Sequence, residues 1–550
     1  MTSLTVTDIP VEVWLDNILT HLPLADLLRL GCANRFFYLL ASDEPFWHRK
    51  LQQDFNFPSS DTARLTGWKF LYRRLRNPQV FVWGDPSHSR LGLPHLRGNY
   101  GTGVPTPTRL RIPGVRIVNL IACGMSFHAL DDQGNLYAWG VLDGTSFAMQ
   151  SDGFSEGGKT ADVPKRLNLP VGLRSISCGR LHASALDANS NIWTFTSWGR
   201  PFRIQSPLLD KASPSHTPVQ VESGWAFTAL LMESGDVLVY WPCSGEMQEK
   251  IGERFRVFDG IEGSKAIPSD EEPNVIPCYI WTLEGVDPVR LPPIPHQLPD
   301  LLATGLSEEE NRKETRLVKI AGMDNNLIGL TNKGHVLRFN KLSGENKYLQ
   351  GSWEYLPYFS DVAKMAELDI FSSESENPLP VPQTMHITHI SAHFKTFVAY
   401  SAGSQSVVLM GTFETEDEDV RPSHREPLKP IIHRKLQYQS VISVVLGDYH
   451  FGALTGTGKL FTWGAYSKGA LGLGNPADIP AGEAGGFATD QQRRAALGRT
   501  GRLIATPPGV TEPAEVRFDH GEKRRRNKYC FAVTAAGWHM GALVIDLDVT

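Results

Sequence analysis

The side chains best suited to chemistry are histidines that recur at one position of a repeated pattern. His182, His450 and His539 each stand three residues after a position that is usually glycine. His128 is displaced by one residue and stands four residues after its glycine. Imidazole is a common metal ligand and general base, so the pattern suggests a metal or catalytic site. One histidine per repeat, however, predicts a ring of separated side chains. We therefore expect each histidine to satisfy a local backbone group at a turn.

Cysteines offer a second possible chemistry. No two of the six have the Cys-x-x-Cys spacing of a zinc site. Cys123 and Cys178 precede a glycine at the same point of the repeat, which is typical of small buried strand residues. We expect no metal site, no reactive thiol and a reducing compartment.

Other catalytic patterns are missing from the sequence. It contains no Gly-x-Ser-x-Gly motif, no phosphate-binding glycine loop and no paired-carboxylate motif. The sequence therefore predicts no catalytic residue, no cofactor and no enzymatic activity. The acidic run Glu414 to Asp419 is expected to be a solvated loop, and the alternative is a segment that attracts a basic target.

The composition is that of an ordinary soluble protein. The 550 residues are 41% hydrophobic and 21% charged, with a formal net charge of −5. This balance does not favour nucleic acid as a partner, and no segment is apolar enough to span a membrane. The basic run Lys523 to Arg526 is expected to be a solvated loop, with a nuclear localisation signal as the alternative. We expect a cytoplasmic or nuclear protein that binds neither nucleic acid nor a membrane.

The first 78 residues are predicted to be helical. Apolar residues recur at helical spacing from Val11 to Leu40. Helices this short bury too little surface to be stable alone, so we expect part of their apolar surface to bind a partner. The alternative is that they cap the next domain. Asn77-Pro78 marks the boundary, because a residue before proline disfavours helix.

Several spaced elements of this segment agree in order with a known family. They are Ile9-Pro10-Val11-Glu12-Val13, Ile18-Leu19, Leu22 to Leu30, Asn34-Arg35-Phe36 and Phe46-Trp47. The segment resembles an F-box over residues 5–57, although Ile9 replaces the usual leucine. In that family this surface binds the Skp adaptor, which connects to a cullin and a RING subunit. The resemblance implies that the adaptor-binding residues are Ile9, Pro10, Val13, Ile18, Leu19, Leu22, Pro23, Leu24, Leu27 and Leu28. Residues 58–78 are expected to form a helical spacer.

From residue 79 onward the sequence is a repeat. Each unit has an apolar strand, a small residue with glycine, a second strand, a glycine turn and a strand that ends in Trp-Gly. The clearest copy runs from Ile442 to Gly464, and another runs from Ile121 to Gly140. Such units are predicted to be blades of a β-propeller. Three longer gaps, near 243–316, 342–386 and 475–527, are expected to be loop insertions.

The half-repeats predict seven blades. The strand Val80 to Gly84 is a second half-repeat that no first half-repeat precedes. At the other end, the first half-repeat at 533–547 is not followed by a second half-repeat. Joined, they complete one blade and close a ring, which hides the edge strands. The units resemble the regulator of chromosome condensation repeat, whose fold is a seven-bladed propeller. The predicted fold is mainly β, with this propeller over residues 79–550 and a small all-α F-box domain before it.

Residues between the repeat glycine and the histidine vary among the blades and are expected to share one face. Aromatic side chains and arginine make good anchors for protein binding. We predict that this set binds a target protein, and the alternative is that it packs between blades. The residues are Arg180, Trp225, His393, Asp448, Tyr449 and Trp538.

Together the two resemblances imply the substrate-recognition subunit of an SCF (Skp–cullin–F-box) ubiquitin ligase. The F-box would bind the Skp adaptor, and the propeller would bind an unidentified target protein. One alternative is a guanine-nucleotide exchange factor for a small GTPase, which the propeller family includes. The other is a propeller scaffold outside any ligase, which adaptor binding would distinguish from a ligase subunit.

Overall fold

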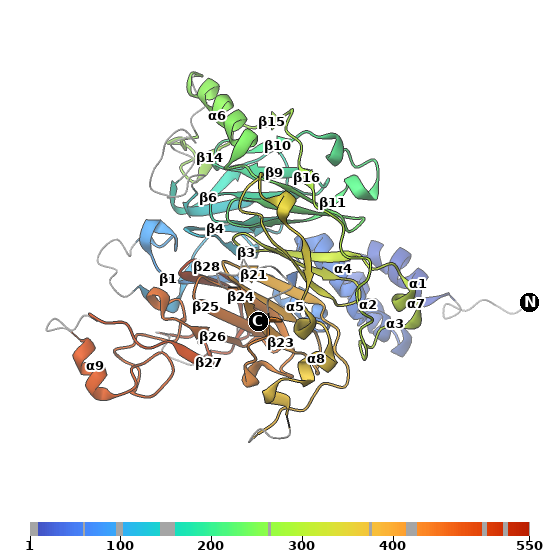
Figure 1. Ribbon diagram of the computed structural model, residues 1–550, viewed down its shortest axis with the longest axis vertical. Helices are drawn as coiled ribbons and strands as arrows, with labels where there is room; N and C mark the ends of the chain where they lie inside the picture. Colours follow the sequence, from blue (N-terminus) through green and yellow to red (C-terminus); the bar gives the residue numbers. More distant parts are fainter. Residues whose placement is uncertain are drawn as a thin grey trace, which may run out of the picture.

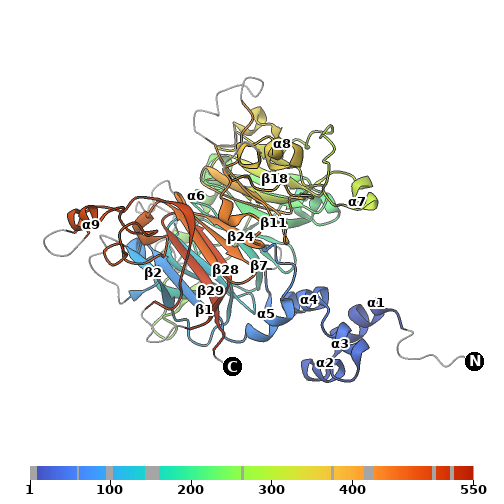
Figure 2. The ribbon, with the colours of Figure 1, turned by 90° about the horizontal axis from the view of Figure 1, so that it is seen from below.

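The chain forms seven β-sheets around a common axis, with a group of helices at one side (Figures 1 and 2). The computed structural model describes residues 9–58, 61–94, 103–142, 160–261, 266–372, 377–413, 426–497, 503–520 and 526–548. The acidic run Glu414 to Asp419 and residues 523–525 of the basic run lie outside these ranges. None of the helices in these ranges is both long and apolar enough to cross a membrane.

The seven sheets are numbered here as blades 1 to 7 in ring order. Blade 1 contains β2 (Val104–Leu110), β1 (Gln79–Gly84), β29 (His539–Asp546) and β28 (Lys528–Ala536). Blade 2 contains β14 (Val275–Pro277), β6 (Thr160–Asn168), β5 (Leu136–Val141), β4 (Ser126–Asp131) and β3 (Ile117–Ala122). Blade 3 contains β15 (Trp281–Leu283), β10 (Phe202–Ile204), β9 (Ile192–Phe195), β8 (Ala183–Asp187) and β7 (Leu173–Cys178).

The remaining four blades follow one another along the chain. Blade 4 contains β11 (Pro218–Ser223), β12 (Thr228–Met232), β13 (Val237–Tyr240) and β16 (Val289–Arg290). Blade 5 contains β17 (Leu317–Gly322), β18 (Leu327–Thr331), β19 (Val336–Phe339) and β20 (Trp353–Tyr355). Blade 6 contains β21 (His389–His393), β22 (Thr396–Tyr400) and β23 (Val408–Thr412). Blade 7 contains β24 (Val441–Leu446), β25 (His450–Thr455), β26 (Leu460–Gly464) and β27 (Val510–Glu515).

The ring is closed by strands from the two ends of the repeat region. The innermost strands contact one another in the circular order β28, β3, β7, β11, β17, β21, β24 and back to β28. In blade 1, β1 lies between β2 and β29, with Val80 opposite both Leu110 and Leu543. The prediction of seven blades closed by joined half-repeats is therefore confirmed.

The N-terminal region is helical, as predicted. It contains α1 (Val11–Val13), the π-helical turn η2 (Trp14–Ile18), the 3₁₀ turn η3 (Leu19–His21), α2 (Leu24–Gly31), α3 (Arg35–Leu40), α4 (Glu44–Phe55) and α5 (Trp68–Arg74). Side chains cap two of the helices: Asn34 accepts a hydrogen bond from the Phe37 amide at 3.0 Å, and Asp43 accepts one from the Phe46 amide at 2.7 Å.

The helical region is joined to one face of the propeller. The Asn56 side chain donates to the carbonyl of Leu173 at 2.9 Å, and the Ala63 amide donates to the carbonyl of Ile442 at 2.7 Å. Their acceptors lie at the starting ends of β7 and β24. We call this end of the propeller the helix-side face. The opposite end, where the inner strands finish, is the far face. Six residues of β24 separate the two faces by about 20 Å.

The predicted loop insertions contain regular structure, so that part of the prediction was wrong. The helices are α6 (Gly245–Asp259), α7 (Glu308–Arg312), α8 (Val362–Ala366) and α9 (Asp490–Ala496). Strands β14, β15, β16 and β20 also come from the insertions and extend blades 2 to 5. Helix α6 forms because Met247, Ile251 and Phe255 fall on one helical face, which is buried. The helical spacing of these three residues is visible in the sequence, but the proline-rich and charged segments on either side led to the prediction of a loop.

Tryptophans of the Trp-Gly pairs pack between blades, as the repeat suggests. The Trp83 indole N–H of blade 1 donates to the carbonyl of Ala470 in the loop after β26 at 2.7 Å. Its ring lies against Gly472, where a Cβ atom would approach the Trp83 Nε1 to 2.7 Å. Gly92 makes the same close approach to Trp139 of blade 2. Glycine is therefore required at both positions by contact with the next blade.

The recurring histidines also join blades, and the prediction of local turn contacts was wrong. His182 Nε2 lies 2.7 Å from Thr228 Oγ1 of the next blade. His450 Nε2 contacts the carbonyl of His539 at 3.4 Å, and His539 Nε2 contacts the carbonyl of Ser126 at 3.2 Å. Although the His450 ring lies against its own turn at Gly447, the Nε2 atoms of all three histidines contact groups of the next blade. Each histidine therefore bridges two neighbouring blades.

These buried histidines predict acid-sensitive stability. Burial lowers the pKa of His182 to about 3 and that of His450 to about 4. Below the unfolded pKa of about 6.5 the unfolded chain takes up protons that the folded chain refuses, so stability is lost as pH falls towards the folded pKa. We expect a loss of about 1.4 kcal/mol per pH unit for each histidine, measured by urea unfolding between pH 7.5 and 5. His182→Gln should make the slope shallower by that amount. An unchanged slope would contradict this origin.

Candidate functional site: two binding surfaces

One candidate surface is a row of exposed apolar side chains on the N-terminal helices. Val11, Val13, Leu24 and Leu28 are 43%, 38%, 40% and 41% exposed. Leu24 and Leu28 are four residues apart, so they lie on the same face of α2. Exposed apolar side chains in such a row are typical of a protein-binding surface.

The structure divides the predicted adaptor-binding residues into three groups. Pro10 and Pro23 are exposed beside the apolar row, and Ile9, Ile18 and Leu22 are half-buried against the core. The third group is fully buried and consists of Leu19 and Leu27.

Burial gives Leu19 and Leu27 a different role from the predicted one. Both side chains are 0% exposed and belong to the core of the helical region. They therefore hold the helices together and are not available for direct contact with an adaptor. Sequence analysis missed Tyr38 and Leu39 of α3, which are 59% and 60% exposed. The third helix is so short that its periodicity does not distinguish its exposed side from its buried side.

The second candidate surface is the mouth of the propeller on the far face. The six predicted target-binding residues all lie in the loops that follow inner strands, or at the end of such a strand. Tyr449 and Trp538 are 54% and 40% exposed, whereas Arg180, Trp225 and His393 are half-buried. The shared face is a consequence of the repeat, because each residue stands at the finishing end of an inner strand or within three residues after it.

An ion pair crosses this mouth. Arg180 Nη1 of blade 3 lies 3.1 and 3.0 Å from the two carboxylate oxygens of Asp448 in blade 7. Strands β7 and β24 are as far apart as two positions in a seven-membered ring can be. The Arg180 guanidinium also lies over the Trp225 ring, 4.7 Å from its centroid. The pair thus spans the axis and bridges blades that do not touch side by side.

His393 completes the cluster around Asp448. Its Nε2 lies 3.1 Å from Asp448 Oδ1. Burial alone would raise the pKa of Asp448, but the hydrogen bond from His393 and the charges of His393 and Arg180 outweigh it. The pKa of Asp448 is therefore held well below its usual range, and the carboxylate stays ionised.

Two further residues at this mouth were not predicted. Asp324 of blade 5 has a pKa raised by burial to about 6, and its amide donates to the carbonyl of Phe394 at 3.0 Å. The Phe394 ring contacts the Tyr449 ring edge-to-face at 5.8 Å. Both residues stand two positions after the repeat glycine or its replacement, as Tyr449 does, whereas most of the predicted residues stand one position after it.

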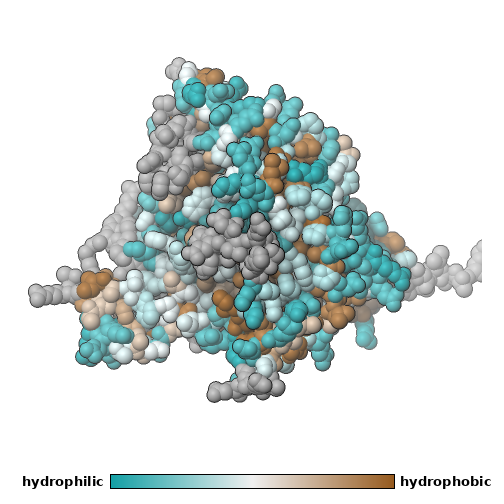
Figure 3. Space-filling model, in the orientation of Figure 1, coloured by the Kyte–Doolittle hydropathy of each residue, from teal (hydrophilic) through white to brown (hydrophobic). Residues whose placement is uncertain are grey.

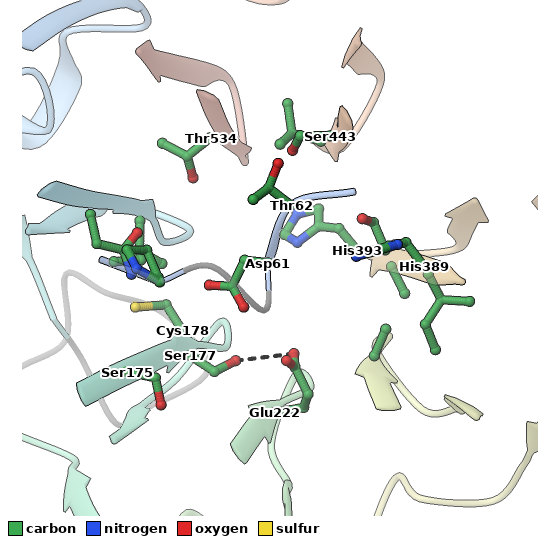
Figure 4. Close-up of a pocket in the computed structure, with 18 of the residues that line it drawn as sticks. Asp61, Thr62, Ser175, Ser177, Cys178, Glu222, His389, His393, Ser443 and Thr534 are labelled. Carbon is green, nitrogen blue, oxygen red and sulfur yellow. Dashed lines mark hydrogen bonds between the residues drawn. The ribbon is translucent and has the colours of Figure 1, made fainter. Parts of the chain in front are cut away.

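Between the two faces lies a polar cavity of about 330 Å³, lined by the seven inner strands and by the segment that follows α4. Asp61 from that segment lies inside it (Figure 4). Glu222 accepts hydrogen bonds from Ser177 Oγ at 3.3 Å and Gln220 Nε2 at 2.9 Å, and burial raises its pKa to about 7. Among the described residues, no three His, Cys, Asp or Glu side chains are grouped as a metal ion would require.

Apolar surface elsewhere is dispersed. On the face shown in Figure 3, apolar side chains form small groups separated by hydrophilic ones. The exposed apolar row of the helical region is therefore marked out by its regular spacing on α2 and not by its size.

Comparisons with known proteins agree with this two-part organisation. Residues 6–53 match the F-box-like family model. The chain is 27% identical over 200 residues to human Protein RCC2, which covers 31% of this chain and 37% of RCC2. It is 34% identical over 109 residues to SCF-associated factor 1 of Saccharomyces cerevisiae, which covers 20% of this chain and 14% of that protein.

A third relative is the human Probable E3 ubiquitin-protein ligase HERC3, which is 32% identical over 192 residues, 32% of this chain and 17% of that protein. These matches thus span at most 37% of the relatives' own lengths. Among solved structures, Prp20p from Saccharomyces cerevisiae covers 86% of this chain and 92% of its own, with 15% identity and a TM-score of 0.48. The chain therefore combines an F-box-like segment with a seven-bladed propeller of the regulator of chromosome condensation type.

The ion pair across the mouth predicts a measurable contribution to stability. Arg180→Met leaves the buried Asp448 carboxylate with only one of its two partners, His393, and we expect the free energy of unfolding to fall by about 1–2 kcal/mol, since Arg180 itself is partly solvated. The double variant Arg180→Met, Asp448→Asn should recover part of the loss. As a control, Arg290→Met breaks the exposed pair with Asp236 and should cost under about 0.5 kcal/mol by urea unfolding. Equal losses in both single variants would contradict the bridging role.

Proposed function

We propose that the chain is the substrate-recognition subunit of an SCF ubiquitin ligase. The observation that carries this proposal is the F-box-like match of residues 6–53 together with the exposed apolar row on α2. In this function the helical region binds a Skp-type adaptor, which in turn connects the chain to a cullin and a RING subunit. The similarity to SCF-associated factor 1 and to the probable ubiquitin ligase HERC3 supports the same biological setting.

The arrangement of the two surfaces suits such a receptor. The helical region is held at the helix-side face by hydrogen bonds and by a shared hydrophobic core, which includes Leu75 and Phe531. The residues predicted to bind the target lie at the far face. A target held there is kept at a fixed distance and orientation relative to the ligase subunits. Its lysines therefore meet the charged ubiquitin carrier at high effective concentration.

Orientation depends on the segment between α4 and β1. Arg64 Nη1 donates to the Tyr529 hydroxyl at 2.9 Å, and Phe70 of α5 packs edge-to-face on the same ring at 5.1 Å. Tyr529 in turn donates to the carbonyl of Gly456 in blade 7 at 2.8 Å. The segment is thus tied to blades 1 and 7. These contacts support a rigid spacer, the role that residues 58–78 have in this proposal.

Adaptor binding is predicted to depend on the exposed face of α2. Replacing Leu24 and Leu28 with aspartate puts two charges on a surface that must be desolvated, so the Skp adaptor and cullin should fall at least tenfold in affinity purifications read by mass spectrometry. The fold should be unaffected, because both side chains are exposed.

The matched control is Leu302→Asp with Leu349→Asp, two leucines of the propeller that are 70% and 77% exposed. This variant should keep the adaptor at the wild-type level. Loss of the adaptor in both variants would point to a general effect of surface charge. Absence of the adaptor from the wild-type purification would contradict the ligase proposal and favour a scaffold or an exchange factor.

Target binding is predicted to depend on the exposed aromatic residues of the far face. Tyr449→Ala with Trp538→Ala removes two large contact side chains and should deplete bound target proteins several-fold, while the Skp adaptor is retained. The measurement is quantitative mass spectrometry of proteins cross-linked to each form, with the Leu302, Leu349 variant as reference. An unchanged set of cross-linked proteins would show that the target binds elsewhere.

A further inference from the structure

Cys123 and Cys178 lie close to each other at the boundary between blades 2 and 3, although the repeat pattern predicted two unreactive thiols. Cys123 follows β3, and Cys178 is the last residue of β7. Both are free thiols, and each sulfur reaches across the blade boundary: Cys123 Sγ lies 2.9 Å from the carbonyl of Gly179, the residue after Cys178, and Cys178 Sγ lies 3.1 Å from His128 Nδ1 of blade 2. The equivalent repeat position thus brings two sulfur atoms together across a blade boundary, which the repeat spacing alone did not reveal.

A histidine with a defined tautomer supports the pair. The Trp198 indole N–H, which can only donate, gives its hydrogen bond to His128 Nε2 at 2.9 Å. Burial lowers the pKa of His128 to about 3, so the ring is neutral and its proton must be on Nδ1. That N–H faces Cys178 Sγ at 3.1 Å and donates to it. Trp198 therefore fixes His128 as a hydrogen-bond donor to the Cys178 sulfur, while burial and the hydrogen bond with Cys123 raise the pKa of the Cys178 thiol, so that Cys123 is the thiol that ionises first.

The hydrogen bonds continue in one direction through both thiols. The Cys178 sulfur accepts a hydrogen bond from His128, so the S–H of Cys178 is free to donate to Cys123. The S–H of Cys123 in turn donates to the carbonyl of Gly179 at 2.9 Å. The hydrogen bond from Cys178 lowers the pKa of Cys123 to about 7. The buried Ser126 hydroxyl beside Cys123 has no partner in the thiol form. Ionisation of Cys123 gives that hydroxyl an acceptor, so the surroundings favour a thiolate.

The pair is accessible to a small oxidant. Cys178 is half-buried and lines the central cavity of about 330 Å³ (Figure 4). A water molecule occupies about 30 Å³ in the liquid, so the cavity has room for a molecule as small as hydrogen peroxide. Cys530, in contrast, is fully buried, and burial raises the pKa of its thiol.

We propose that Cys123 and Cys178 form a redox-active dithiol that hydrogen peroxide converts to a disulfide between blades 2 and 3. Cys123 first loses its proton to solvent, the proton of Cys178 then moves to Cys123, and the resulting Cys178 thiolate attacks one peroxide oxygen. The O–O bond breaks, the departing hydroxide takes up the proton that Cys123 released, and a sulfenic acid is left on Cys178. The Cys123 sulfur then attacks Cys178, and its proton leaves with the hydroxyl group as water. Two thiols lose two electrons, and one peroxide becomes two waters.

The test is oxidation of the purified full-length chain. The reduced protein is treated briefly with hydrogen peroxide at pH 7.5, the remaining thiols are alkylated in denaturant, and peptides are identified by mass spectrometry without reduction. We expect a cross-linked peptide pair that contains Cys123 and Cys178, two hydrogen masses lighter than the free peptides, before half of the exposed Cys32 is oxidised. Cys530 should be recovered fully alkylated.

Variants separate the roles of the two sulfurs. Cys123→Ser should abolish the cross-link and leave a sulfenic acid on Cys178 that a dimedone probe traps. Trp198→Phe removes the fixed donor to His128 and should slow cross-linking several-fold, with the folded state checked by its thermal unfolding midpoint. Cys530→Ser should leave the rate unchanged. Recovery of Cys123 and Cys178 as separately alkylated thiols after Cys32 is fully oxidised would overturn the proposal.

Discussion

The pairing of β1 with β29 is the contact on which the rest of the architecture depends. It joins the first strand of the propeller to the last strand, so that the edges of β1 and β29 that face each other are both paired. Closure fixes the inner strands around one axis, so that all of them start on one face and finish on the other. Because Arg64 binds Tyr529 at the start of β28, the helical region is attached beside this same closing blade. The helical region is therefore attached at the helix-side face, whereas the predicted target-binding residues lie at the far face.

The boundaries between blades explain why most of the chemically suggestive residues are structural. The Nε2 atoms of His182 and His450 contact groups of the next blade, and the Trp83 indole N–H donates to a neighbouring blade in the same way. Each contact is buried, so an unpaired polar group there would be costly. Blades 2 and 3 differ, because their boundary contains two thiols, Cys123 and Cys178, and a neutral histidine. At this boundary the structural role and a chemical role coexist.

Sequence patterns predicted the propeller because most blades repeat the same local requirements: a glycine after the inner strand, alternating strands and, in blades 1, 2 and 7, a Trp-Gly end. They could not predict Leu19 and Leu27 as core residues, because these short helices carry apolar side chains on an exposed side as well as on a buried side. The Arg180–Asp448 ion pair joins residues 268 positions apart on opposite blades. Periodicity places each of the two on the right face, but only the closed ring brings them together.

The most direct test of the two-surface arrangement is an experimental structure of the full-length chain bound to a Skp-type adaptor, determined by cryo-electron microscopy. The arrangement predicts that the adaptor covers Leu24 and Leu28, leaves Tyr449 and Trp538 uncovered, and lies on the helix-side face with the helices docked as they are here. An adaptor seated on the far face, or helices that detach from β7 and β28 when the adaptor binds, would contradict it.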